Sequence, residues 1–68
     1  MNSLNRERGQ RVVVKCANGE FRENVVWEWD EHMVYVCSER QFTALQEGRE
    51  APPPIGFHEE DVQPATRH

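Results

Sequence analysis

The sequence predicts a small, mainly β domain with a single short helix. Its 68 residues are enough for one domain with a thin core. Hydrophobic residues make up 37% of the chain, which is too many for a chain that is disordered throughout. Short apolar runs alternate with turn residues, a pattern typical of antiparallel strands. The stretch from Phe21 to Ser38 contains both tryptophans and the only tyrosine, so we expect the core to form around it.

We expect one folded domain over residues 11–62. Residues 1–10 are polar without hydrophobic periodicity and predict a flexible arm, and residues 63–68 predict a flexible tail. No apolar run is long enough for a signal peptide or a membrane span, and two cysteines are too few for a disulfide scaffold. These features predict a cytoplasmic protein without membrane contact.

The first predicted hairpin begins with Arg11–Ala17, a run rich in β-branched residues. Asn18-Gly19 follows and predicts a two-residue type I′ turn, which needs positive φ at both central positions. This turn would place Cys16 opposite Phe21. Because side chains alternate between the two faces of a strand, one face becomes apolar. This predicted core face comprises Val12, Val14, Cys16, Phe21, Val25, Trp27 and Trp29.

The second predicted turn lies at Asp30-Glu31, as a two-residue loop or within the four-residue loop 29–32. Either loop places Val25 opposite Val36. A three-residue loop would shift the pairing by one residue and turn Tyr35 inward instead. We prefer the first register because it keeps one apolar face across three strands. The third strand then adds Val34 and Val36 to the core face.

The preferred register also gathers apolar residues on the reverse face of the sheet. They are Val13, Val26, Met33, Tyr35 and Cys37. Since Cys16 would lie on the core face and Cys37 on the reverse face, the two cysteines cannot form a bridge. We expect both thiols to be free, with Cys16 the more protected of the two.

A short helix is predicted over about 38–47. Ser38 and Gln41 have the spacing of a capping box, in which each side chain bonds the other residue's backbone amide. Gly48 can adopt the left-handed conformation that ends a helix. The run Pro52–Pro54 then predicts a stiff bridge or, alternatively, a ligand for an aromatic groove on another protein.

The run from Ile55 to Val62 predicts a short strand, a tight turn and a last extended pair. It resembles the closing segment of Src-homology-3-like small barrels, where a strand with glycine and an aromatic residue leads through a 3₁₀ turn into the final strand. The resemblance implies a small barrel of about five short strands, with the helix inserted before the last two. Proline-peptide binding is not implied, because His58 and Asp61 stand where the peptide-binding family usually has proline and tyrosine.

No catalytic or metal site is predicted. The candidate ligands are Cys16, Cys37, His32 and His58. They lack the paired spacing of two to four residues that is typical of structural zinc sites. No cysteine has a base at a recognisable spacing, and the acidic residues near position 30 flank a turn. We therefore expect no cofactor and no enzymatic activity.

The reverse face predicts the function. Soluble monomers rarely leave an apolar patch in water, and a symmetric dimer is the commonest way to bury one. We expect a small non-catalytic protein-interaction module that forms a homodimer or binds another protein. The predicted interaction surface comprises Val13, Val26, Met33 and Tyr35.

The alternative hypothesis is a nucleic-acid-binding small barrel. Such domains bind through a sheet face that carries basic and aromatic side chains. The predicted contacts would be Arg11, Lys15, Arg22 and Tyr35. The net charge of −4 disfavours this alternative, because phosphate backbones repel an acidic protein.

Overall fold

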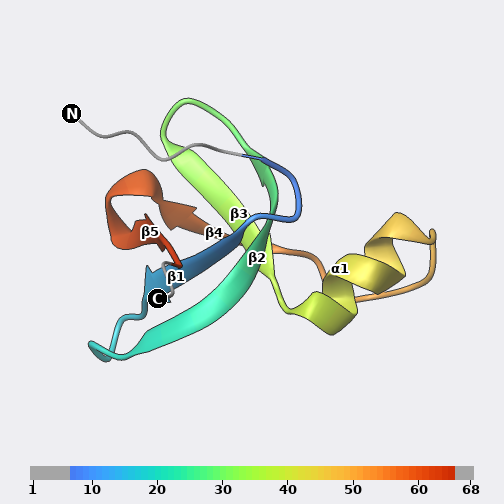
Figure 1. The fold of residues 1–68 in the computed structure, drawn as a ribbon, viewed down its shortest axis with the longest axis horizontal. Helices are drawn as coiled ribbons and strands as arrows, with labels where there is room; N and C mark the ends of the chain where they lie inside the picture. Colours follow the sequence, from blue (N-terminus) through green and yellow to red (C-terminus); the bar gives the residue numbers. More distant parts are fainter. Residues whose placement is uncertain (1–6, 66–68) are drawn as a thin grey trace.

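The computed structural model describes residues 7–65 as an antiparallel sheet with one helix (Figure 1). The elements are β1 (Arg11–Lys15), β2 (Phe21–Trp29), β3 (Met33–Cys37), α1 (Glu39–Gln46), β4 (Ile55–His58), the 3₁₀ turn Glu59–Asp61 and β5 (Val62–Pro64). The five strands are arranged in the order β4-β3-β2-β1-β5. The mainly β class with one short helix is therefore confirmed. The sheet is open and does not close into a barrel, because β4 and β5 are its two edges.

The first turn differs from the predicted one. The Cys16 amide bonds the Glu20 carbonyl at 2.7 Å, and the Gly19 amide bonds the Cys16 carbonyl at 2.9 Å, so the loop has three residues. Gly19 has a φ of 90°, and no other residue type in the described chain has positive φ. This is a type I turn followed by a left-handed glycine, which needs one positive φ instead of two. The predicted type I′ turn is wrong.

A β-bulge at Trp27 sets the register of the second hairpin. Val26 lies opposite Val36, whereas Glu28 lies opposite Tyr35, so Trp27 is an extra residue on β2. A bulge changes the register partway along a hairpin, and no single turn length can reproduce it. The preferred sequence register, with Val25 opposite Val36, is therefore wrong.

The first loop and the bulge together decide which face each side chain occupies. Phe21 lies opposite Lys15 and is 60% exposed, and Trp29 is 41% exposed, so neither belongs to the core. Val26 lies on the concave face of the sheet, which is the face that carries the core, and it has no exposed surface. The prediction that places Val26 on the reverse face is wrong. The core cluster is Val12, Val14, Val26, Val34, Val36 and Val62. The sequence predictions for Val12, Val14, Val34 and Val36 are confirmed.

The predicted capping of the helix is confirmed at both ends. The Gln41 amide donates to Ser38 Oγ at 3.1 Å, and the Ser38 amide donates to Gln41 Oε1 at 3.0 Å. Gly48 has a φ of 76°, and the Arg49 amide bonds the Ala44 carbonyl at 2.8 Å. These are the features of a Schellman motif, which satisfies carbonyls at the helix end.

The proline run Pro52–Pro54 connects α1 to β4 (Figure 1). Gln41 Nε2 donates to the Pro52 carbonyl at 3.1 Å, which ties the start of this run to the first turn of the helix. This connection agrees with the bridge interpretation. A role as a ligand for another protein stays a prediction.

Part of the predicted N-terminal arm lies against the sheet. The Gly9 amide bonds the Val26 carbonyl at 2.8 Å. The Arg8 guanidinium lies 4.6 Å from the centre of the Trp27 ring, and Phe42 of α1 meets the same ring edge-on at 5.6 Å. Residues 7–10 and α1 therefore hold Trp27 between them. The rest of the predicted arm, residues 1–6, lies outside the described residues.

The predicted C-terminal tail begins within β5. Gln63 and Pro64 lie opposite Val13 and Val12, and the Ala65 amide bonds the Arg11 carbonyl at 3.1 Å. These pairs extend the sheet along β1. Residues 66–68 lie outside the described residues.

Candidate interaction surfaces

The predicted interaction surface on the reverse face is divided. Val26 is in the concave core, so it cannot contribute. Val13 lies opposite Glu23 and Tyr35 lies opposite Glu28. Their partners are five positions apart on β2, which corresponds to about 16 Å along the strand.

The helix occupies the space between these two positions. Val25 and Cys37 lie opposite each other at this point and are buried, and α1 packs against β2 and β3. Val13 and Tyr35 are thus on opposite sides of the helix contact. The four predicted residues do not form one patch.

Met33 and Tyr35 do form a local cluster on the outer face of β3 and β4. Both side chains are half-buried, and Tyr35 lies opposite Gly56 of β4. A Cβ atom at Gly56 would stand 2.8 Å from Tyr35 Cε2 and 3.1 Å from Met33 Cε. The tyrosine ring therefore rests on the bare backbone of Gly56, and only glycine leaves room for it.

The predicted nucleic-acid contacts do not share one surface. Arg22 lies opposite Val14 and therefore on the concave side, whereas Arg11 and Lys15 are on the outer side. Arg11 is also paired with Glu39 of α1. Tyr35 packs on β4 instead of beside these cations. The structure does not bring the four residues together into a basic stripe.

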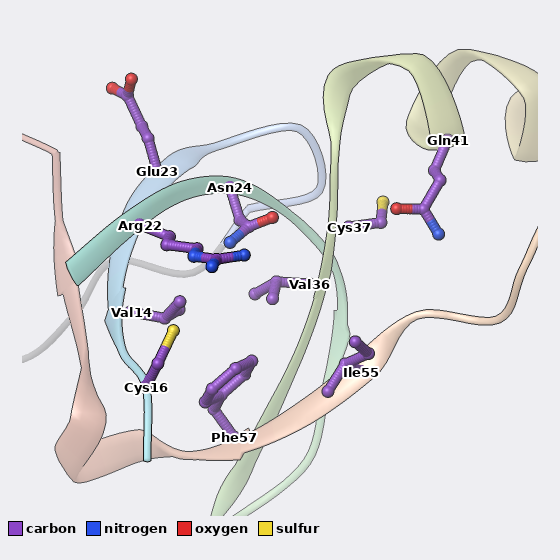
Figure 2. A pocket seen from close by; sticks show the side chains of 10 residues that line it. All are labelled: Val14, Cys16, Arg22, Glu23, Asn24, Val36, Cys37, Gln41, Ile55 and Phe57. Atoms are coloured by element: carbon purple, nitrogen blue, oxygen red, sulfur yellow. The ribbon is translucent and has the colours of Figure 1, made fainter. Parts of the chain in front are cut away.

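A pocket of about 390 Å³ opens on the concave side of the sheet (Figure 2). Its lining includes Val14, Cys16, Arg22, Asn24, Ile55 and Phe57. The first half of β2 supplies three polar side chains, α1 supplies Gln41, and β4 supplies two of the apolar ones (Figure 2). A mainly apolar hollow with a few polar groups is the usual form of a binding pocket.

The chemistry of the two cysteines argues against a nucleophile in this pocket. Cys16 and Cys37 are free, as predicted, and they lie on opposite faces of the sheet. Cys37 is the more buried one, so the predicted order of protection is wrong. Burial raises the pKa of the Cys37 thiol, which disfavours the reactive thiolate. Within residues 7–65, no group of three histidine, cysteine or acidic side chains could hold a metal ion.

The edge strand β4 is the surface that the sequence did not indicate. The large hydrophobic side chains that are exposed in the described chain are Phe21, Trp29 and Ile55. Ile55 has the largest exposed fraction of these, 63%, and it also lines the concave pocket. No residue of β4 is acidic, lysine or arginine. Only the strand order reveals that Ile55–His58 is an edge.

The fold and its surfaces define a mainly β protein with an open five-stranded sheet, one helix and an apolar edge. Comparisons with protein-family models, with curated proteins and with solved structures find no match for this chain. Within the described range, 7–65, no helix is both long enough and apolar enough to span a bilayer.

Proposed function

We propose that this protein is a small non-catalytic protein-interaction module that self-associates through the surface around β4. This β4 surface consists of Met33 and Tyr35 on the outer side and Ile55 and Phe57 on the concave side. The observation that carries the proposal is the 63% exposure of Ile55 on an uncharged edge strand beside an apolar pocket.

The physical argument is the cost of leaving this surface in water. Burial of the exposed Ile55 side chain contributes a favourable free energy in proportion to the apolar area that is removed from water. The half-buried Phe57 and the Met33–Tyr35 cluster extend the apolar area to both sides of β4. A partner that joins the edge of β4 can contact both faces, and a homodimer is the commonest symmetric assembly.

The proposal keeps two finer expectations from the sequence. One is that the open sheet is a variant of the Src-homology-3-like small barrel, which is supported by the 3₁₀ turn Glu59–Asp61 between the last two strands. The other is a cytoplasmic location, which is supported by two cysteines that are not bridged.

The test is sedimentation equilibrium from about 5 to 500 µM, a range that brackets a micromolar dissociation constant. We expect the wild-type chain to form a dimer that dissociates on dilution. Ile55→Lys should be monomeric, and its thermal transition should match that of the wild-type chain at concentrations where the wild type is dissociated, because Ile55 is mostly exposed in the single chain.

Phe21→Lys is the matched control. Phe21 is as exposed as Ile55 but lies on β2, so this substitution should leave the dimer intact. A wild-type chain that stays monomeric throughout the range would contradict the proposal. So would a Phe21→Lys variant that dissociates as readily as Ile55→Lys.

A further inference from the structure

The backbone of β4 has a defined set of hydrogen-bonding groups on its open side. The Glu59 amide bonds the His32 carbonyl at 2.9 Å, and His58 lies opposite Met33. In an antiparallel ladder the bonded pairs alternate, so Ile55 and Phe57 also bond toward β3. The amides and carbonyls of Gly56 and His58 must therefore point away from β3.

The residue before β4 continues this pattern. The carbonyl of Pro54 belongs to the same peptide plane as the Ile55 amide and points in the opposite direction, toward the open side. Pro54 has no amide hydrogen to leave unpaired there. From Pro54 to His58, the open edge thus offers two donors and three acceptors.

We propose that two copies of this chain pair through β4, antiparallel and about a two-fold axis, with Gly56 of one copy opposite Gly56 of the other. The result would be one continuous ten-stranded sheet. The inference rests on the proposed self-association and specifies its geometry.

This register matches donors to acceptors. Each Gly56 amide would donate to the Gly56 carbonyl of the second copy, and each His58 amide would donate to the Pro54 carbonyl of the second copy. Every amide on the two edges is then paired. Pro54 has no amide hydrogen to donate in return, so each His58 carbonyl stays bonded to water.

The same register pairs the apolar side chains. Ile55 of each copy would lie opposite Phe57 of the other copy, so the two-fold axis creates two such pairs. Both pairs would lie on the concave side, where Ile55 and Phe57 already line the pocket (Figure 2). A shift by two residues in one direction would place Ile55 opposite Glu59 of the second copy. A shift in the other direction would place Pro54 opposite Gly56 and Pro52 opposite His58, so that both outward carbonyls of each copy would lack a donor instead of one. The Gly56 register is therefore the best-matched one.

Charge favours the antiparallel arrangement. The chain carries no charged side chain from Pro52 to Phe57, but three acidic residues follow at Glu59–Asp61. The two-fold axis would place these acidic turns at opposite ends of the paired strands. A parallel arrangement would place them side by side and is disfavoured by repulsion.

The size of the contact predicts its strength. Four residues of strand span only about 13 Å. Such a contact belongs at the low end of interface sizes, so the dimer should depend on concentration instead of being obligate.

The decisive substitution is His58→Pro. His58 has a φ of −65°, which proline adopts without strain, and its side chain is exposed. The substitution removes only the amide hydrogen that the proposed pairing uses, and His58→Ala is the matched control that keeps it. We expect His58→Pro to weaken dimerisation by about tenfold or more and His58→Ala by less than about threefold. Circular dichroism and thermal unfolding verify that both variants fold.

A second measurement does not depend on the proline variant. Hydrogen exchange of the Gly56 and His58 amides should slow markedly when the wild-type concentration rises through the dimer range. The Gln63 amide, which points toward Val13 of β1 on the other edge, serves as the reference.

Three outcomes would overturn the inference. If the wild-type chain dimerises but His58→Pro and His58→Ala behave alike, the edge geometry is wrong and the proposed function stands. If the wild-type chain is monomeric, both fail. If it is monomeric but binds a lysine-rich peptide in a way that His58→Pro abolishes, the edge accepts a basic partner segment and not a second copy.

Discussion

The two edges of the sheet differ in how they are protected. β5 has three residues, Val62–Pro64, and ends in a proline. β4 has four residues, of which the first, Ile55, is 63% exposed. Both edges belong to one sheet and are joined by a 3₁₀ turn of three acidic residues.

Natural sheets protect their edges with short strands, proline and charge. β5 combines the first two within its three residues, and its one buried side chain, Val62, points into the core cluster. β4 has its prolines only before the strand and no charged side chain within it. The comparison indicates that β5 is a closed edge and that β4 is the edge available for pairing.

The largest expected effect tests how firmly β5 is anchored. Val62 is buried against Val14, its partner on β1. Val62→Ala should lower the free energy of unfolding by about 2 kcal/mol, from lost burial and the cavity that remains. Urea unfolding measures this. Gln63→Ala, an exposed change on the same strand, should stay within about 0.5 kcal/mol; equal effects would show that β5 is not held by its core side chain.

The corresponding test on β4 concerns its outer face. Gly56→Ala should cost about 1.5 kcal/mol, because the new Cβ would stand 2.8 Å from the Tyr35 ring. In a Tyr35→Ala background the same change should cost much less. A double-mutant cycle by thermal unfolding gives this coupling, and additive effects would contradict the contact.

A smaller effect concerns how β4 is held at its start. Gln41→Ala removes half of the capping box and the bond to the Pro52 carbonyl. We expect a loss of about 1 kcal/mol, with faster hydrogen exchange in β4 but not in β5. Ser38→Ala loses a similar amount through the cap alone and should leave β4 exchange relatively unchanged. If the two variants exchange alike, the Pro52 bond does not hold β4.

The smallest effect is a dependence on pH. Burial raises the pKa of the Cys37 thiol, so the unfolded chain loses this proton first, above about pH 8.5. The stability contributed by the neutral buried thiol is complete below that pH and is lost as the pH rises toward the native pKa. Denaturation midpoints across this range should fall less steeply with pH for Cys37→Ala than for the wild-type chain.

A thiol reagent should modify the half-buried Cys16 before Cys37, and the reverse order would contradict the burial of Cys37.

Features that depend on neighbouring residues could be read from the sequence. The capping box of Ser38 and Gln41, the end of the helix at Gly48 and the turn after β4 all involve groups within a few residues of one another. Local hydrogen bonding and backbone freedom decide such features, so the chain outside them matters little. The mainly β class follows from the same kind of local pattern.

The assignment of side chains to faces required the tertiary structure. The three-residue loop at Gly19 shifts the first register by one residue, which moves Phe21 out of the core and Val26 into it. The bulge at Trp27 shifts the second register by one residue. Asn-Gly is compatible with more than one loop length, and the bulged Trp27 contacts Arg8 and Phe42, which are far away in sequence. Since the side-chain period of a strand is two, a one-residue slip reverses the faces completely.

Which strands lie at the edges of the sheet also depends on the tertiary structure. The sequence predicted a short strand at residues 55–57, and β4 extends it to His58, but the strand order placed β4 at the edge and left Ile55 exposed. Whether a strand has one neighbour or two depends on how distant segments pair, and no local pattern encodes it. For this protein, the sequence determined the elements, and only the tertiary structure decided which surface is available to a partner.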